Sequence, residues 1–235
     1  MFLLINKPKG ITSHDVVNRI RRLVNTYPAT PRLRRARIGH AGTLDPNATG
    51  LLIVGIGRES TKKLGMLAKD TTKTYIAEIV LGEERETDDV EGNIRNTKYE
   101  ILNTKQITNS KIQTVLKQFI GQQKQLPPEY SAIKIKGKKA YELARKGKDV
   151  KLEARKIVIH SIKLLGYIYP KLEIECEVSS GTYLRALARD IGRKLGTGAY
   201  LKNLKRTAIG KYELKDAIKL DKITLENLKS FSFEI

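Results

Sequence analysis

The sequence has little of what disulfide-linked, metal-binding and membrane-spanning proteins need. Its 235 residues include one cysteine, Cys176, three histidines and no tryptophan. A single cysteine excludes an internal disulfide, and His14, His40 and His160 lack metal-ligand spacing. No apolar run approaches the roughly 20 residues of a membrane span, and the apolar part of the first ten residues is too short for a signal peptide. We therefore expect a cytoplasmic protein without membrane contact or bound metal.

Acidic residues are also scarce, with 25 Asp and Glu against 45 Lys and Arg, a formal net charge of +20. The electrostatic field of such a positive net charge concentrates polyanions at the protein surface, so nucleic acid is the first partner to consider. Anionic small molecules or simple solubility are the alternatives. One stretch, "EERETDDVEGN" at 83–93, reverses the basic trend.

Apolar periodicity predicts strands alternating with helices. Strands are expected at 2–5, 51–57, 73–82, 157–159 and 171–178, and helices over 13–24, 108–120 and 184–195. Ser13 is the expected N-cap of the first helix, and Gly121 and Gly196 are the expected C-caps of the other two. The segment 134–156 carries ten basic and three acidic residues, which predicts a solvated or RNA-facing excursion. The length fits one large domain or one domain with a small appendage.

Motifs for nucleotide cofactors are weak. "GIGRES" at Gly55 lacks the third glycine of a dinucleotide fingerprint, and Lys62 stands in the wrong place for a P-loop. No serine stands in a nucleophile elbow. We expect no cofactor.

"GHAGTLDPNATG", residues 39–50, places Asp45 before a proline among small residues. Aspartate before proline is typical of an Asx-type turn. The small residues at 41, 42, 48 and 50 would equally let a bulky partner approach a reactive carboxylate. From these twelve residues alone, both interpretations stay open.

Five segments, read in order, resemble a known family. They are "INKPKGITSHDVV", "GHAGTLDPNATGLLIVGIGRESTK", "KTYIAEIVLG", "LPPEYSAIKIKGKKAYELARKG" and "SSGTYLRALARDIGRKLGTGAYLKNLKR". They resemble the successive motifs of the TruB family of tRNA pseudouridine-55 synthases, from the first ten residues to about Tyr212.

The resemblance implies an α+β pseudouridine synthase fold, with a mixed, mostly antiparallel sheet, flanking helices and a basic thumb. The catalytic domain would cover 1–212, including a mobile thumb at about 121–151 that would close over RNA. Residues 213–235 would form a short extension packing on the core, leaving no room for a C-terminal PUA domain. The implied activity is the isomerisation of uridine to pseudouridine at position 55 in the tRNA T-loop, by a monomer without cofactors.

The family motifs also imply roles for single residues. Asp45 would be the nucleophile, Arg185 would pair with its carboxylate, and Tyr75 would stack on the target ring and act in proton removal. The remaining predicted residues contact or support the substrate: His40, Tyr183, Leu204 and Lys7.

Each residue also has an ordinary interpretation. Without the resemblance, Tyr75 and Leu204 would be core or sheet residues, Arg185 would meet phosphate or water, and His40 would be a loop histidine. Two other functions remain open: pseudouridylation of another T-loop-like RNA, and non-catalytic tRNA binding or folding. The run "TYPATPRLRRAR" at 26–37 is longer than the usual family link, and we expect Arg32, Arg34 and Arg35 in it to contact phosphates.

Overall fold

The computed structural model describes residues 1–25, 36–95, 107–135, 137–144, 146–147, 150–224, 226–228 and 230–233. The chain divides into two units. Unit 1 comprises Met1–Tyr75 and Leu204–Ile235, and unit 2 comprises Ile76–Asn203. Two strands, β4 (Lys73–Leu81) and β10 (Ala199–Ile209), begin in one unit and end in the other.

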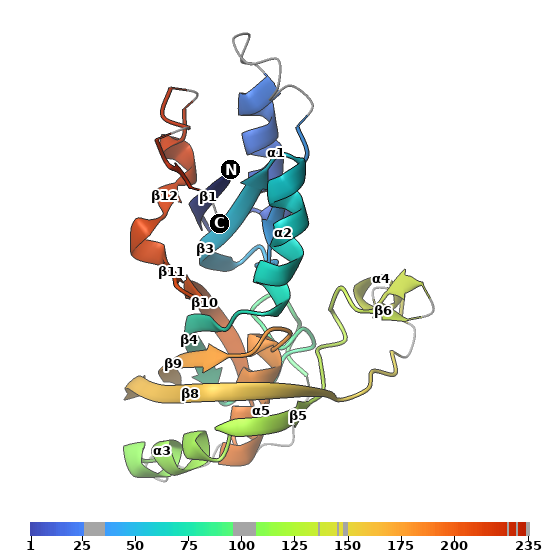
Figure 1. Ribbon diagram of the computed structural model, residues 1–235. Coiled ribbons are helices and arrows are strands. Elements are labelled where there is room, and N and C mark those ends of the chain that lie inside the picture. Colours follow the sequence, from blue (N-terminus) through green and yellow to red (C-terminus); the bar gives the residue numbers. More distant parts are fainter. Residues whose placement is uncertain are drawn as a thin grey trace. The chain divides into compact units, whose positions relative to one another are not determined.

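Unit 1 contains a sheet in the order β12-β1-β3-β10 (Figure 1). The strand β1 (Phe2–Lys7) is antiparallel to β3 (Ala48–Ile56), and β3 is parallel to the end of β10. The edge strand β2 (Ile38–Ala41) pairs with β3, and α2 (Arg58–Lys69) follows β3. The elements that follow β10 are short: β11 (Tyr212–Glu213), η2 (Leu214–Asp216), β12 (Ile218–Lys219), η3 (Leu220–Lys222) and β13 (Ser232–Phe233).

The core of unit 1 combines both ends of the chain. Leu3 and Ile5 of β1 and Ile20 of α1 (Ser13–Asn25) pack with Leu220 and Leu228, all at most 4% exposed. The strand β12 continues this contact by pairing in parallel with β1. Residues from the end of the sequence therefore belong to the same core as the first strand.

The first helix begins differently from our expectation. Ser13 is its first helical residue, and its hydroxyl bonds the backbone of Leu44 instead of capping the helix. Thr12 takes the N-cap role, because its Oγ1 accepts from the Asp15 amide at 3.0 Å while Asp15 Oδ2 accepts from the Thr12 amide at 2.8 Å. This reciprocal pattern is a capping box. The prediction of Ser13 as N-cap was wrong.

Unit 2 contains strands in the order β4-β9-β8-β5. The long hairpin of β8 (Arg155–Ile168) and β9 (Lys171–Val178) is antiparallel, and β5 (Gly121–Gln125) lies beside β8. The helix α5 (Leu184–Leu195) ends at Gly196 in the left-handed region, as predicted.

The helix α3 (Asn109–Lys117) is shorter than predicted and has Gln118 as its C-cap. Gly121 has a φ of +99° and begins β5. The predicted C-cap role of Gly121 was therefore wrong, because the chain leaves the helix one turn earlier and enters the sheet.

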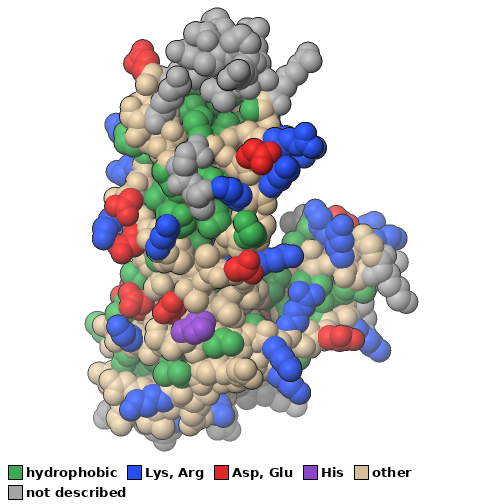
Figure 2. Space-filling model, viewed as in Figure 1, with side chains coloured by type: hydrophobic (Ala, Val, Ile, Leu, Met, Phe, Trp, Pro, Cys, Tyr) green, Lys and Arg blue, Asp and Glu red, His purple; other side chains and the backbone are tan. Residues whose placement is uncertain are grey.

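A small lobe of unit 2 is set apart from its sheet (Figure 1). It consists of β6 (Lys134–Ile135), β7 (Lys138–Lys139) and α4 (Ala140–Ala144). Figure 2 shows Lys and Arg side chains on this lobe, and Lys134, Lys138 and Lys139 are exposed. The lobe lies in the predicted thumb segment, whose role in closing over RNA stays a prediction.

The strand directions confirm the predicted α+β class. In unit 1, β12 pairs in parallel with β1 and β10 with β3, and in unit 2 the pairs β5–β8 and β8–β9 are antiparallel. The arginine-rich run predicted to contact phosphates lies largely at 26–35, outside the described residues.

Candidate active site

The loop that carries Asp45 is held by three side chains from three different elements. Arg206 of β10 donates to the carbonyl of Gly42 at 2.9 Å, the Ser13 hydroxyl of α1 donates to the carbonyl of Leu44 at 3.1 Å, and Lys7 of β1 donates to the carbonyl of Pro46 at 3.2 Å. The held carbonyls belong to every second residue of the loop.

Asp45 itself stands in a turn. Its carbonyl accepts a hydrogen bond from the Ala48 amide at 3.0 Å, which closes a turn across Pro46. Its side chain is half-buried. The turn interpretation of this stretch is thus correct, and it is compatible with a chemical role, because the turn fixes the direction of the carboxylate.

Lys7 is fully buried and lies against this turn. Its ammonium donates to the carbonyls of Pro8 and Ile11 at 2.9 and 2.6 Å as well as to Pro46. Burial lowers the pKa of Lys7 to about 8, and the carboxylate of Asp45 acts in the opposite direction. Lys7 therefore holds the Asp45 turn from β1, and its pKa depends on the charge of the Asp45 carboxylate.

Arg206 is a central residue of this region that our sequence analysis missed. Its side chain is 1% exposed, and its Nε donates to the carbonyl of Leu51 at 2.7 Å in addition to the bond to Gly42. A signal was present: Leu204 and Arg206 alternate on a strand, so both belong to one face of the sheet. A basic residue in a strand is usually exposed, which is why we did not select it.

Two glycines of the opening motif give room to Arg206. A Cβ on Gly50, which has a φ of +102°, would overlap the Arg206 backbone, and a Cβ on Gly42 would lie 3.3 Å from Arg206 Nη1. We expected these glycines to clear space for a bulky partner. The structure gives a different reason, because the protein's own arginine fills that space.

Tyr75 and His40 lie in the same unit. Tyr75 of β4 is 8% exposed, and the Arg206 guanidinium carbon lies 6.0 Å from its ring centroid. His40 is paired with Val54 across β2 and β3, and its buried Nδ1 has no hydrogen-bond partner among the described residues. Burial, followed by the charges of Arg206 and His14, lowers the pKa of His40 and so favours its neutral imidazole.

Leu204 begins the unit 1 part of β10. It is half-buried and lies opposite Ala48 in the parallel register. Unit 1 thus holds five of the predicted residues: Lys7, His40, Asp45, Tyr75 and Leu204.

Tyr183 and Arg185 belong to unit 2, at the start of α5. The side-chain amide of Gln125 holds the Tyr183 backbone at both ends, accepting from its amide at 2.9 Å and donating to its carbonyl at 3.1 Å. Arg185 donates to the carbonyls of Thr87 and Tyr130 and lies 3.5 Å from the carboxylate of Asp89. The predicted pairing of Arg185 with Asp45 stays a prediction.

The other two arginines of α5 meet the acidic stretch 83–93. Arg189 pairs with Asp88 at 2.8 Å, and Arg193 pairs with Glu84 through two bonds of 2.7 and 2.9 Å. Burial raises the pKa of Asp88 to about 6, although four arginines oppose this shift. The acidic stretch, whose purpose our sequence analysis left unassigned, supplies counter-charges to this helix.

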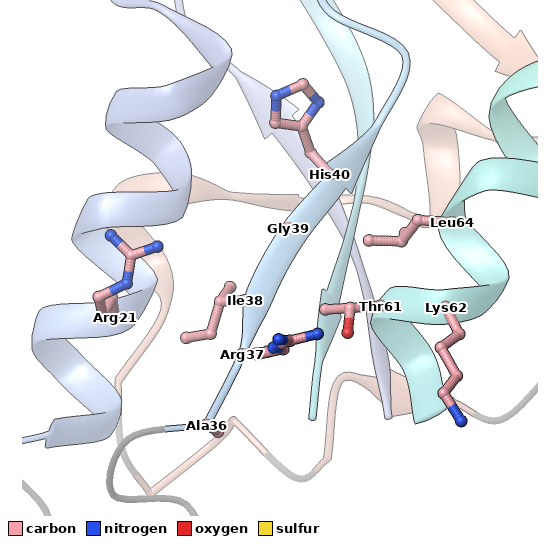
Figure 3. A pocket seen from close by; sticks show the side chains of 9 residues that line it. All are labelled: Arg21, Ala36, Arg37, Ile38, Gly39, His40, Thr61, Lys62 and Leu64. Carbon is pink, nitrogen blue, oxygen red and sulfur yellow. The ribbon is translucent and has the colours of Figure 1, made fainter. Parts of the chain in front are cut away.

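A cavity of about 570 Å³ opens in unit 1 between α1, β2 and α2 (Figure 3). Its lining includes Arg21, Arg37, Lys62 and His40, and no described Asp or Glu lines it. Arg21 projects from α1 and Lys62 from α2, on either side of β2 (Figure 3). We call these three cations and His40 the basic groove.

The described residues contain no group of three or more His, Cys, Asp or Glu side chains placed to hold a metal ion. In the same part of the chain, no helix combines the length and the apolar composition needed to span a membrane.

Comparison with known proteins gives the family. The model of the TruB family pseudouridylate synthase N-terminal domain matches residues 31–184, and that of the tRNA pseudouridylate synthase B C-terminal domain matches residues 185–230. The tRNA pseudouridine synthase B of Mycobacterium bovis is 42% identical over 99% of this chain and 74% of its own length. That of Parabacteroides distasonis is 44% identical over 90% of this chain and 86% of its own length.

Solved structures share the fold. A chain of a Cbf5-Nop10-Gar1 complex superposes with a TM-score of 0.66 and 27% identity, covering 94% of this chain and 52% of that chain. A chain of an H/ACA RNP bound to a substrate RNA containing 2′-deoxyuridine gives a TM-score of 0.67 at 24% identity, over 99% of this chain and 56% of that one. From the family models and the relatives together, the chain belongs to the TruB family of pseudouridylate synthases.

Proposed function

We propose that this enzyme converts uridine 55 in the T-loop of tRNA to pseudouridine. The relatives at 40 to 44% identity are named tRNA pseudouridine synthase B. The observation that carries the proposal in the structure is the Asp45 turn, whose alternate carbonyls are held by Arg206, Ser13 and Lys7. A carboxylate on such a fixed turn is suited to positioned attack, because orientation removes much of a reaction's entropic cost.

The reaction is an isomerisation. The bond between ribose C1′ and uracil N1 breaks, the ring turns, and a bond forms between C1′ and C5. The C5 proton is lost and N1 gains a proton, so nothing is oxidised and no group is added. Such chemistry asks for a nucleophile or base and for a slot that holds the turning ring.

In this proposal, Asp45 is the nucleophile, and Arg185 keeps its carboxylate ionised against the desolvation that would raise its pKa. Tyr75 stacks on the target ring and takes part in removing the C5 proton. Leu204 supplies an aliphatic wall. A base inside folded RNA must be turned out to reach such a slot, and aromatic and aliphatic side chains can hold it there.

The remaining residues act on the RNA around the target. His40 enters the T-loop as a neutral imidazole, Tyr183 contacts the substrate, and Lys7 holds the Asp45 turn. We assign the RNA backbone to the basic groove, since Arg21, Arg37 and Lys62 line it together with His40. The lobe of unit 2 closes over the RNA as a thumb.

The test is to incubate the protein with unmodified tRNA transcripts and to map pseudouridine at base resolution. We expect product at position 55 of the wild-type transcript and none in a transcript with cytidine there. Product at another uridine would indicate that the substrate is a different T-loop-like RNA. Binding without product at any position would favour a non-catalytic RNA-binding or folding protein and contradict the proposal.

A further inference from the structure

Arg206 is the largest fully buried side chain among the described residues, at 1% exposure. A buried charge normally requires a partner of opposite charge. Within the described residues, no carboxylate lies within ion-pair distance of Arg206, and its guanidinium donates to the carbonyls of Gly42 and Leu51. The protein thus holds a cation in its interior with backbone dipoles.

The two carbonyls lie at the two ends of the segment that carries Asp45. Gly42 follows β2, and Leu51 lies within β3. A planar guanidinium offers several donors in a fixed fork, so one side chain can set the separation of both ends. The same guanidinium lies over the Tyr75 ring, 6.0 Å from its centroid.

Two glycines in the backbone leave space for Arg206. Arg206 lies opposite Gly50 in the parallel register of β3 and β10, and a Cβ at Gly50 would overlap its backbone. A Cβ at Gly42 would lie 3.3 Å from Nη1. Close packing of this kind transmits a displacement instead of absorbing it.

We propose that Arg206 is a positioning residue of the reaction: its guanidinium holds both ends of the Asp45 segment and the Tyr75 ring at a fixed separation. It does not touch the reacting atoms. Its effect on the rate passes through Asp45 and Tyr75, so this inference rests on the proposed function.

The first test does not need a substrate. Arg206→Met keeps an apolar side chain of comparable reach but loses both hydrogen bonds. We expect amide hydrogen exchange of residues 42–51 to become faster by at least about 10-fold. Arg189→Met is the matched control, because Arg189 is also buried but is held by Asp88 and Asp190 in unit 2. Because Arg189→Met also lowers overall stability, it measures the acceleration at residues 42–51 that comes from that loss alone, and this acceleration should be smaller than in Arg206→Met. Equal acceleration in both variants, or none in Arg206→Met, would overturn the proposal.

The second test separates chemistry from binding. In single-turnover reactions with saturating enzyme, Arg206→Met should lower the rate of pseudouridine formation by about 100-fold, the effect expected of a misplacement near 1 Å. The dissociation constant for tRNA should change by less than about 3-fold, because phosphate contacts dominate affinity. Weaker binding with an unchanged rate would contradict a positioning role.

Two further variants keep the proposal testable should Arg206→Met fold poorly. Arg206→Lys retains the charge but not the fork, so it should show a smaller loss of rate than Arg206→Met. Gly42→Ala leaves Arg206 intact and presses on Nη1, and it should lower the rate without weakening tRNA binding. A wild-type rate in both would overturn the proposal. If wild-type protein makes no pseudouridine but the exchange result holds, the proposed function fails and the mechanical role of Arg206 survives.

Discussion

Buried arginines in the two units have different kinds of partner: carboxylates in unit 2 and backbone carbonyls in unit 1. In unit 2, Arg185 and Arg189 of α5 face Asp89 and Asp88 at 3.5 and 2.8 Å, so charges of both signs are present in equal number. In unit 1, Arg206 is held by carbonyls, and no described Asp or Glu forms an ion pair with it. The first arrangement fixes a helix to its acidic neighbour, and the second leaves a positive field around the candidate active site.

The positive charge of Arg206 affects the pKa of neighbouring groups in unit 1. Arg206 contributes to the lowered pKa of Lys7, His40 and Lys73, each of which is lowered mainly by burial. A positive interior favours anions, and both a catalytic carboxylate and RNA phosphates are anions. The contrast therefore separates Arg189, which holds α5 to the acidic stretch 83–93, from Arg206, which we propose positions the Asp45 segment.

The largest expected effect on stability lies in unit 2. Arg189→Met leaves the carboxylate of Asp88 buried without its nearest cation, and breaking a buried pair costs about 3 to 5 kcal/mol. Urea unfolding should show a loss near the lower end, because the Asp88 carboxyl, whose pKa is about 6, can take up a proton. The control is Glu59→Gln, which removes the exposed pair with Lys62 and should cost little. Equal losses in the two variants would contradict the assignment of Arg189 as a structural arginine.

A second prediction concerns the basic groove. Replacing Arg21, Arg37 and Lys62 by Gln should weaken tRNA binding and lower the slope of log K against log salt by up to about 2 to 3, since each phosphate contact contributes about 0.7 to 0.9. A matched variant with the same loss of charge replaces Lys215, Lys219 and Lys222, which are exposed near the end of the chain. Its slope should change less. Identical slopes for both triple variants would remove the groove from the RNA interface.

The smallest expected effect is a shift in titration. Removing the charge in Arg206→Met should raise the pKa of His40, because in the wild-type protein the Arg206 charge helps to lower that pKa. Burial, the larger cause, remains, so the pKa should stay below the ordinary value of 6.5. His14 is the other charge acting on this imidazole. An NMR titration, with the signal assigned through His14→Gln and His160→Gln, measures the shift. An unchanged or lower pKa would show that the Arg206 charge does not reach His40.

Periodic apolar residues were sufficient to predict much of the fold. Alternation along 73–82 and 171–178 predicted β4 and β9, and the spacing of leucines with a final glycine predicted α5 and its C-cap. The helix α2 was not predicted, because Ser60 and Leu64 are its only fully buried described residues and their neighbours are polar or glycine. A short amphipathic face of this kind carries little signal.

Polar residues in the interior could not be assigned from the sequence. The ordinary interpretation of Arg185 was contact with phosphate or water, but Arg185 and its neighbour on the helix, Arg189, are 8% and 6% exposed. Their partners stand about 100 positions earlier, and spacing along the chain cannot reveal such pairs. Arg206 was missed for the same reason, since its carbonyl partners at Gly42 and Leu51 are set by the parallel register of β3 and β10.

The most direct test of the account is the replacement of Asp45 by Asn, which keeps the size and the turn-forming ability of the side chain but removes its charge. Asp70→Asn, at an exposed carboxylate after α2, is the matched control. With unmodified tRNA, we predict that pseudouridine formed by Asp45→Asn falls below detection while tRNA binding persists, and that Asp70→Asn reacts at the wild-type rate. Equal product from Asp45→Asn and wild type would contradict the account, because the turn held by Lys7, Ser13 and Arg206 would then carry no reactive group.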